Sequence, residues 1–145
     1  MTVYSIDNLK VGIVSSRFNN SVVNELLASA VNKLLSEGVD KDNILHKNVP
    51  GALEIPIVAN ALAASKKVDV ILGVGAVIRG ETYHFEVVSD QSAFGLMQVQ
   101  LNHNIPVVNA IITTNSSEEA YARTKNKGEE AALAAIEMAF MLKNI

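Results

Sequence analysis

A histidine near the middle of the chain follows a glycine-punctuated stretch, in a context that favours acid–base chemistry. The stretch, residues 75–85 (GAVIRGETYHF), comes after the apolar run at residues 68–72. This order predicts a buried strand, a loop and a helix start, which is where open α/β sheets bind ligands. Free backbone N–H groups at a helix start attract anions, and imidazole moves protons near pH 7. Residues 80–82 therefore suggest an anion cradle, and we favour a functional role for His84 just behind it.

Two further segments supply side chains that suit a flat, hydroxylated ligand. Phe18 follows a short apolar run, where its ring can stack on a heterocycle at the sheet edge. Alternatively, Phe18 covers the core while Asn19 or Asn20 caps the next helix. Glu54 lies in residues 49–56 (VPGALEIP) and either accepts hydrogen bonds from a polyol or stabilises a helix start through its dipole. Both alternatives stay open at each position.

A basic cluster at residues 123–128 (RTKNKG) precedes the apolar run of the last expected helix. Its three cations could clamp a phosphate beside that helix N-terminus. Spacing alone favours a solvated connecting loop instead. No G-x-x-x-x-G-K-[ST] loop or G-x-G-x-x-G fingerprint occurs, so nucleotide triphosphates and dinucleotides have no motif support.

The remaining composition narrows the class of protein. His46 and His103 lack a comparable context and are expected to be surface residues. The chain has no cysteine and no His-x-x-x-His spacing, which gives no disulfide, no thiolate nucleophile and no metal pattern. Its net charge of −3 argues against nucleic acid and anionic membranes as partners. We expect a cytoplasmic protein without metal or cofactor, because residues 1–10 are polar and unlike a signal peptide.

The elements that must position these residues alternate along the chain. A length of 145 residues, of which 49% are hydrophobic and 19% charged, predicts one globular domain over residues 1–145. Apolar runs predict strands at residues 11–15, 43–48, 68–74 and 106–113. Helical spacing predicts helices at residues 22–35, 56–64, 84–102, 117–122 and 128–142. Right-handed crossovers then predict a flavodoxin-like three-layer α/β/α sandwich with a four-stranded parallel sheet.

The last expected helix indicates an assembly. Between residues 131 and 142 every residue except Glu137 is apolar or alanine. A surface helix needs only one apolar stripe, and a small chain cannot easily cover the rest alone. We therefore predict a homo-oligomer. The alternative is an alanine-rich helix with a partly exposed face of small residues.

Taken together, several segments resemble the 6,7-dimethyl-8-ribityllumazine synthase family. They follow one another in order over nearly the whole chain, at residues 16–19, 49–56, 75–85, 113–120 and 126–138. The resemblance implies condensation of 5-amino-6-(D-ribitylamino)uracil with 3,4-dihydroxy-2-butanone 4-phosphate, two small-molecule substrates. The products are the lumazine, phosphate and water. It also implies a pentamer-based homo-oligomer, whether pentamer, decamer or closed capsid.

The resemblance assigns roles to individual residues, with Phe18 stacked on the pyrimidine ring. Backbone groups of Ala76, Val77 and Ile78 recognise the ring edge. The ribityl chain and the ring are held by Ala52, Leu53 and Glu54. The phosphate binds at a helix start that consists of Gly80, Glu81 and Thr82. Arg123 of the neighbouring subunit also binds it. His84 shuttles protons.

The chain departs from the family pattern at three places. Asn109 stands where the family has an apolar or aromatic residue near the ring, and Tyr83 replaces a proline before His84. Residues 123–128 form a shorter loop than usual. Two other functions remain open: a module that binds flavin or a lumazine without turning it over, and a mainly structural shell protein. Neither needs His84 and Arg123, so the presence of both in register favours the enzyme.

Overall fold

A parallel β-sheet forms the middle layer of the computed structural model, which describes residues 5–145. All three strand pairs run parallel, in the spatial order β2-β1-β3-β4. This order reverses direction between β1 and β3, as in flavodoxin-like sheets. The strands are β1 (Val11–Ser16), β2 (Ile44–Val49), β3 (Val70–Ile78) and β4 (Val107–Thr114).

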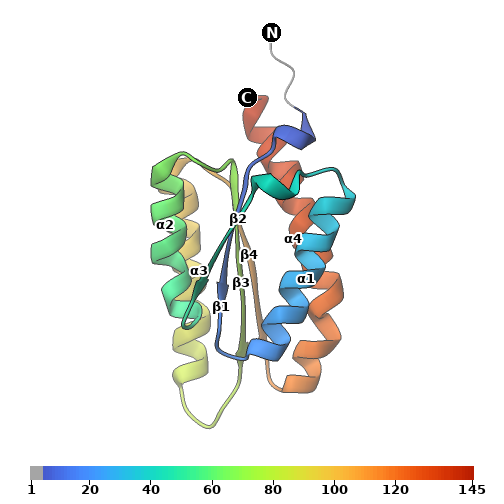
Figure 1. Cartoon of the computed structure of the whole chain (residues 1–145). Helices are drawn as coiled ribbons and strands as arrows, with labels where there is room; N and C mark the ends of the chain where they lie inside the picture. Colours follow the sequence, from blue (N-terminus) through green and yellow to red (C-terminus); the bar gives the residue numbers. More distant parts are fainter. Residues whose placement is uncertain (1–4) are drawn as a thin grey trace.

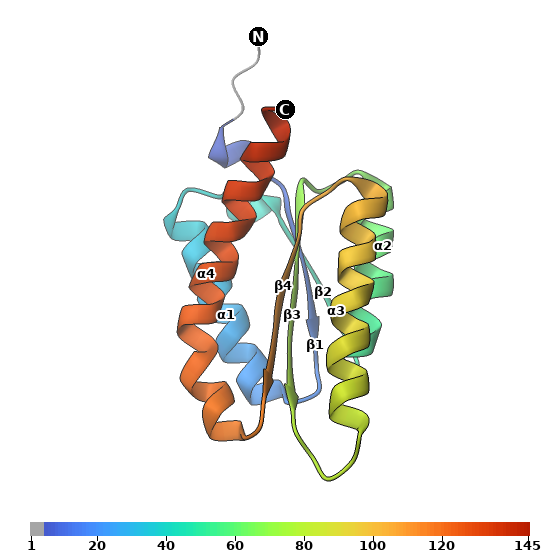
Figure 2. The ribbon, with the colours of Figure 1, turned by 180° about the vertical axis from the view of Figure 1, so that it is seen from behind.

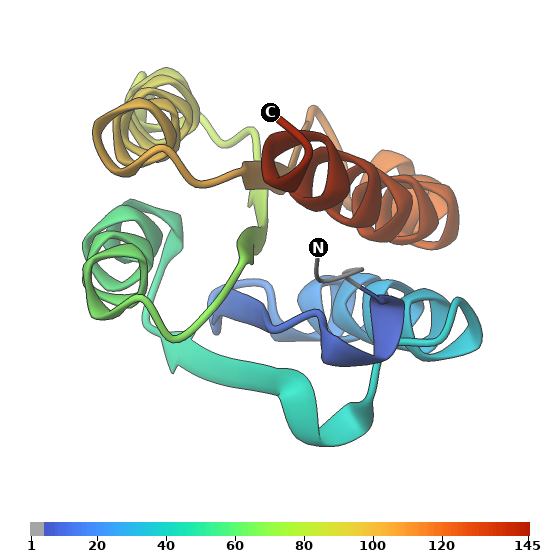
Figure 3. The same ribbon diagram turned by 90° about the horizontal axis from the view of Figure 1, so that it is seen from above.

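Two helices cover each face of the sheet, as Figures 1 and 2 show from opposite sides. Seen from above, the pair α1 and α4 lies across the sheet from the pair α2 and α3 (Figure 3). The helices are α1 (Asn20–Ser36), α2 (Ile55–Ser65), α3 (His84–His103) and α4 (Ser117–Lys143). Short 3-10 turns are η1 (Ile6–Asn8), η2 (Lys41–Asn43) and η3 (Ala52–Glu54). The predicted three-layer sandwich on a four-stranded parallel sheet is therefore confirmed.

The two inner strands are buried on both faces. Every residue of β1 is buried; Ile13 packs toward α1 and α4, and Val14 packs toward α2 and α3. This explains why the inner strands read as continuous apolar runs rather than alternating ones. At Gly73 in β3, an added Cβ would lie only 2.9 Å from a methyl carbon of Leu96. The glycine thus lets α3 approach the sheet closely.

The predicted break in the C-terminal helix is wrong. Residues 123–128 were expected as a loop, but α4 is continuous from Ser117 to Lys143. The basic cluster consequently lies in mid-helix and not beside a helix N-terminus. Gly128 is buried against α1, where an added Cβ would lie 2.5 Å from Cβ of Ser29, and the Ser29 hydroxyl donates a 2.6 Å hydrogen bond to the Lys125 carbonyl. This close packing outweighs the helix penalty of glycine, about 1 kcal/mol.

The apolar end of α4 is buried on one face within its own chain. Ala131, Ala132, Ala135 and Ala139 are buried in the core shared with α1 and the sheet. Leu133 and Met141 on the same helix are exposed. Small alanine side chains allow α1 to lie close, so the face of this helix toward α1 and the sheet needs no partner subunit to cover it. Further exposed apolar side chains lie on α2 and α3, namely Ile57, Phe94, Met97 and Leu101.

The third strand also differs from its predicted bounds. It begins at Val70 rather than residue 68 and continues to Ile78, because its last residues pair with Ile111–Thr114 of β4. Ala76 and Val77 are therefore strand residues, not loop residues. Across residues 5–145, no helix is both long enough and apolar enough to cross a bilayer.

Candidate active site

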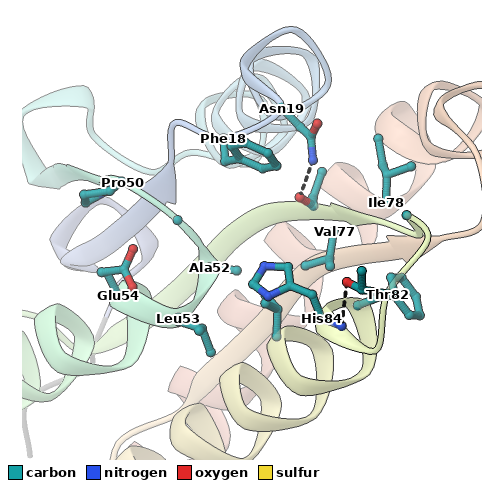
Figure 4. Close-up of a pocket in the computed structure, with 15 residues that line it drawn as sticks. Phe18, Asn19, Pro50, Ala52, Leu53, Glu54, Val77, Ile78, Thr82 and His84 are labelled. Carbon is teal, nitrogen blue, oxygen red and sulfur yellow. Dashed lines mark hydrogen bonds between the residues drawn. The ribbon is translucent and has the colours of Figure 1, made fainter.

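A cavity of about 550 Å³ opens at the carboxyl ends of β1 and β3. Its walls come from the β1–α1 connection, η3, the end of β3 and the start of α3 (Figure 4). Most of the predicted site residues line it, namely Phe18, Ala52, Leu53, Glu54, Ala76, Val77, Ile78, Gly80, Thr82 and His84. The sheet order reverses between these two strands, and such a switch point is where open α/β sheets bind ligands.

Phe18 forms one wall with its ring largely exposed. The residue is 71% exposed, so the alternative that it covers the core is wrong. The backbone around it is anchored to the loop after β2, since Arg17 N–H donates to the Val49 carbonyl at 2.8 Å and Phe18 N–H to the Pro50 carbonyl at 3.0 Å. The ring is thus presented to the cavity by a fixed backbone, as stacking on a planar ligand requires.

Asn19 connects this wall to the end of β3. It occupies the N-cap position of α1 in a left-handed conformation, with φ of 61°, and its side chain makes no capping hydrogen bond. Its Nδ2 instead donates to the Ala76 carbonyl at 2.9 Å (Figure 4). The side chain of Asn19 therefore does not cap α1 but fixes the start of this helix to β3.

The backbone at the end of β3 is open toward the cavity. Pairing of β1 with β3 stops at Val74, whereas pairing of β3 with β4 continues to Ile78. Beyond Val74, the β1 side of the strand is therefore free of ladder hydrogen bonds, and Asn19 uses one carbonyl there. Backbone groups in this position can recognise the polar edge of a ring.

Glu54 lies at the opposite wall, at the end of η3. It is exposed and occupies the N-cap position of α2, but its carboxylate makes no capping hydrogen bond. Its backbone N–H donates to the Gly51 carbonyl at 3.1 Å, which closes the turn after β2. The carboxylate is therefore available to accept hydrogen bonds from hydroxyl groups of a ligand.

His84 is the first residue of α3, and its ring projects from the helix start into the cavity (Figure 4). The side chain is exposed, and its backbone N–H donates to the Thr82 hydroxyl at 3.3 Å. Around Gly80, an added Cβ would meet no atom within 4 Å, so the loop before the helix is open. The helix start and the imidazole thus face the same space.

Three predicted residues lie outside this cavity. Glu81 is exposed in the loop but is not a lining residue. Asn109 is exposed on β4, where its Oδ1 accepts a 2.9 Å hydrogen bond from the Ile111 N–H. Arg123 donates to the Glu119 carbonyl at 2.9 Å and lines a second cavity of about 380 Å³ with Lys127. Within one chain, then, the expected phosphate clamp is separated from His84.

Several lining residues were not predicted as site residues: Asn19, Pro50, Gly51, Phe85 and Val88. Asn19, Gly51 and Phe85 adjoin predicted residues in the sequence, and Pro50 lies two residues before Ala52. Val88 lies one helical turn beyond His84, the spacing that places two side chains on one helix face. The helical register was therefore the signal that could have identified Val88.

The two remaining histidines have specific partners. His46 is an exposed residue, as predicted, but its Nε2 lies 2.6 Å from the hydroxyl of buried Ser15. Partial burial of the ring lowers the pKa of His46 below its ordinary value. His103 is half-buried rather than a free surface residue, and it hydrogen-bonds Asn60 at 2.8 Å, which joins α3 to α2.

The strand order and the place of the cavity define a flavodoxin-like α/β protein with a small-molecule site at its switch point. The family model of 6,7-dimethyl-8-ribityllumazine synthase matches residues 8–143. The chain is 48% identical to the 6,7-dimethyl-8-ribityllumazine synthase of Nitrosospira multiformis over 139 residues, 96% of this chain and 87% of that protein. It is also 48% identical to that of Burkholderia vietnamiensis, over 92% of this chain and 79% of that protein. The chain belongs to the 6,7-dimethyl-8-ribityllumazine synthase family.

Proposed function

We propose that this chain condenses 5-amino-6-(D-ribitylamino)uracil with 3,4-dihydroxy-2-butanone 4-phosphate, giving 6,7-dimethyl-8-ribityllumazine, phosphate and water. The observation that carries the proposal is the cavity in which Phe18, Glu54 and His84 face one space beside an open helix start. Family membership supplies the reaction, and the cavity supplies groups suited to each part of the two substrates. Under this proposal, the chain is a transferase that acts in the cytoplasm.

The pyrimidine substrate occupies the side of the cavity toward β1. Phe18 stacks on its ring, and the open backbone of residues 76–78 reads the polar ring edge. Ala52 and Leu53 border the ribityl chain, and the Glu54 carboxylate accepts hydrogen bonds from its hydroxyls. Stacking and edge recognition together fix the direction in which the amine of the substrate points.

The phosphorylated substrate occupies the side toward α3. Gly80 and Thr82 lie just before the first turn of this helix, whose backbone N–H groups and dipole favour an anion. Glu81 contributes through its backbone, because a carboxylate side chain would repel the phosphate. Holding the phosphate charge assists its departure as a leaving group.

His84 serves the proton transfers of the reaction. Amine attack on the carbonyl, loss of water, loss of phosphate and ring closure each move a proton, and an exposed imidazole near neutral pH can both accept and donate one. The imidazole projects into the space between the two binding regions (Figure 4). Much of the acceleration comes from holding two reactants together, which contributes whether or not a base is present.

A neighbouring copy of the chain completes the site on this proposal. Arg123 and Asn109 lie outside the cavity of their own chain, yet an arginine suits phosphate recognition. An exposed apolar face supports assembly: Phe94, Met97 and Leu101 lie along α3, and Ile57 lies on α2. Large apolar patches on a protein surface mark interaction sites. We therefore propose a pentamer-based homo-oligomer in which Arg123 and Asn109 of one subunit face the cavity of the next.

Mixing both substrates with the purified protein tests the function. Lumazine is followed by absorbance and fluorescence, phosphate release is followed in parallel, and both are compared with the uncatalysed reaction. Lumazine formation above background that falls in Arg123→Ala, with a raised KM for the phosphorylated substrate, supports the synthase and its shared site. Tight binding of a lumazine without acceleration would instead identify a non-catalytic binding module.

A further inference from the structure

The side chain of Arg79 spans the loop that leads into the active-site helix. Arg79 directly follows β3, and its backbone N–H donates to the Thr114 carbonyl at 2.9 Å, which continues the sheet by one residue. Its Nε donates to Asn115 Oδ1 at 2.8 Å, in the connection from β4 to α4. One residue therefore fixes the end of β3 to the end of β4.

The same guanidinium also contacts the first turn of α3. Its Nη1 forms an ion pair with Glu86, and its central carbon lies 4.3 Å from the centre of the Phe85 ring. The hydrogen bond from Arg79 is the main reason why the pKa of Glu86 is lowered, so the carboxylate stays ionised as a partner. A planar guanidinium can make fork-like hydrogen bonds and a cation–π contact together, which an ammonium cannot.

The loop enclosed by these contacts has few anchors of its own. Among the described residues, its hydrogen bonds are internal or to the next helical turn: His84 N–H to the Thr82 hydroxyl, and Glu86 and Val87 N–H to the Tyr83 carbonyl. Residues 80–84 are all exposed. The ends of the loop are therefore held chiefly by Arg79, which lies at one end and contacts the residues just past the other.

We propose that Arg79 is a positioning residue that holds Gly80, Thr82 and His84 in their reactive geometry by clamping β3, the β4–α4 connection and the first turn of α3 together. The inference rests on the proposed function for the roles of Gly80, Thr82 and His84, whereas the contacts of Arg79 do not depend on it. Arg79 itself is not a lining residue of the cavity, so it acts through the loop and not on the substrate. Phe85 transmits the clamp, because its ring both lines the cavity and contacts Arg79.

The clamp predicts an uneven effect on the two substrates. In Arg79→Gln, we expect kcat to fall about 10-fold and the KM for the phosphorylated substrate to rise about 10-fold, since small misplacements of catalytic groups have effects of this size. The KM for the ribitylaminouracil should change less than about 2-fold, because Phe18 and Glu54 are held by other elements. Equal changes in both KM values, or no change in any constant, would overturn the proposal.

Two further variants separate the clamp from a simple charge effect. Arg79→Lys keeps the positive charge but cannot reach Asn115, Glu86 and Phe85 at once, so it should restore only part of the lost activity. Full recovery with lysine would show that the charge alone matters and would overturn the clamp. Glu86→Gln should shift the same constants in the same direction, whereas the matched control Glu25→Gln, on an exposed position of α1, should leave them unchanged.

Hydrogen exchange tests the clamp without turnover. Backbone amides of residues 80–86 should exchange faster in Arg79→Gln than in the wild type, while those of β1 and η3 keep their rates. Equal exchange of residues 80–86 in both proteins would overturn the proposal even if kinetics changed. A wild-type protein that forms no lumazine would instead refute the proposed function, and the exchange result would still decide the clamp.

Discussion

Asn19 shows at the scale of one residue how a single side chain shapes the site. Its φ of 61° places it in the left-handed region, which asparagine tolerates better than most residues. This conformation turns the chain from β1 into α1 and leaves Phe18 exposed, while Nδ2 fixes the turn to β3. Asn19 thus anchors the backbone of the cavity wall to β3, and the adjacent Phe18 exposes its ring to the cavity.

Replacing His84 tests how much the reaction depends on acid–base catalysis. In His84→Ala we expect kcat to fall by roughly 10–100-fold, at or below the lower end of acid–base contributions, because positioning of two bound reactants persists. Steady-state kinetics checks this, with His103→Gln as a control at the far end of the same helix. A loss greater than about 10,000-fold with the fold intact would show that proton transfer dominates.

His46 should make stability depend on pH. Its pKa in the folded state lies below the ordinary 6.5 because burial disfavours the charged ring. The unfolded chain therefore binds the proton more tightly, and stability that is complete above pH 6.5 falls as pH decreases through the folded-state pKa. Urea unfolding between pH 7.5 and 5 measures this.

The matched variant His46→Gln isolates that contribution. It should show a flatter dependence of the unfolding free energy on pH over the same interval, because glutamine does not titrate. Carboxyl groups titrate at lower pH and affect both proteins alike. Identical pH dependence in the two proteins would contradict the assignment to His46.

At the scale of elements, the contact between α1 and α4 determines how the C-terminal third of the chain folds. Gly128 lies where the two helices touch, and Ser29 bonds the backbone of α4 there. The contact keeps residues 123–128 helical and places Arg123 and Lys127 one turn apart beside the second cavity. Gly128 looks like a helix breaker in the sequence, but its close packing against α1 keeps α4 continuous.

Gly128→Ala should therefore destabilise the protein, although alanine is the better helix former by about 1 kcal/mol. The new methyl carbon would lie 2.5 Å from Ser29 and 2.9 Å from the backbone nitrogen of Ala30, so the helices must separate. We expect a net loss of about 1–3 kcal/mol in the free energy of unfolding, measured in denaturant. Gly80→Ala, which meets no neighbouring atom, should change it by less than about 0.5 kcal/mol.

At the scale of the whole molecule, the site residues lie on two surfaces of one subunit. The cavity holds Phe18 and His84, whereas Arg123 lines a separate cavity. If neighbouring copies combine these surfaces, each active site needs His84 from one chain and Arg123 from another. The assembly would then be part of the catalytic apparatus and not only a source of stability.

Mixing two impaired variants tests this sharing. His84→Ala and Arg123→Ala are each expected to be slow, but subunits exchanged between them should form some sites with both native residues. Activity of the mixture after dissociation and reassembly should exceed the sum of the separate activities. No gain in a verified mixed oligomer would contradict a site that combines His84 of one chain with Arg123 of another.

The exposed face of α3 offers a second test at this scale. Leu101 is 73% exposed and continues the apolar line of Phe94 and Met97. Leu101→Glu should shift the molar mass measured by light scattering toward the monomer, because a charge buried in an apolar interface is unfavourable. Glu25→Gln, on α1, serves as the exposed control. An unchanged mass would remove this face from the interface.

Local patterns in the sequence were sufficient for the parallel sheet, for the first three long helices and for the edge of the sheet where the main cavity lies. Strand runs, helical spacing and glycine positions depend on neighbours within a few residues, so they predicted α/β alternation and placed Phe18 and His84 at the ligand edge of the sheet. The grouping of Glu54 with them at this edge followed from the family resemblance. The carboxyl ends of parallel strands meet there whatever the details of packing. That regularity is why the site could be located before its geometry was known.

Only the tertiary structure decided the continuity of α4, the clamp at Arg79 and the separation of Arg123 from His84. Each depends on contacts between residues far apart in the chain. Gly128 packs against Ser29, Arg79 bonds Asn115, and Arg123 lies beside Ile111–Thr113 of β4 in a cavity that His84 does not line. Packing at such contacts overrides local propensity, as at Gly128, and no spacing rule encodes it. The sequence by itself determined the fold class and the family, and three-dimensional packing decided which side chains share a site.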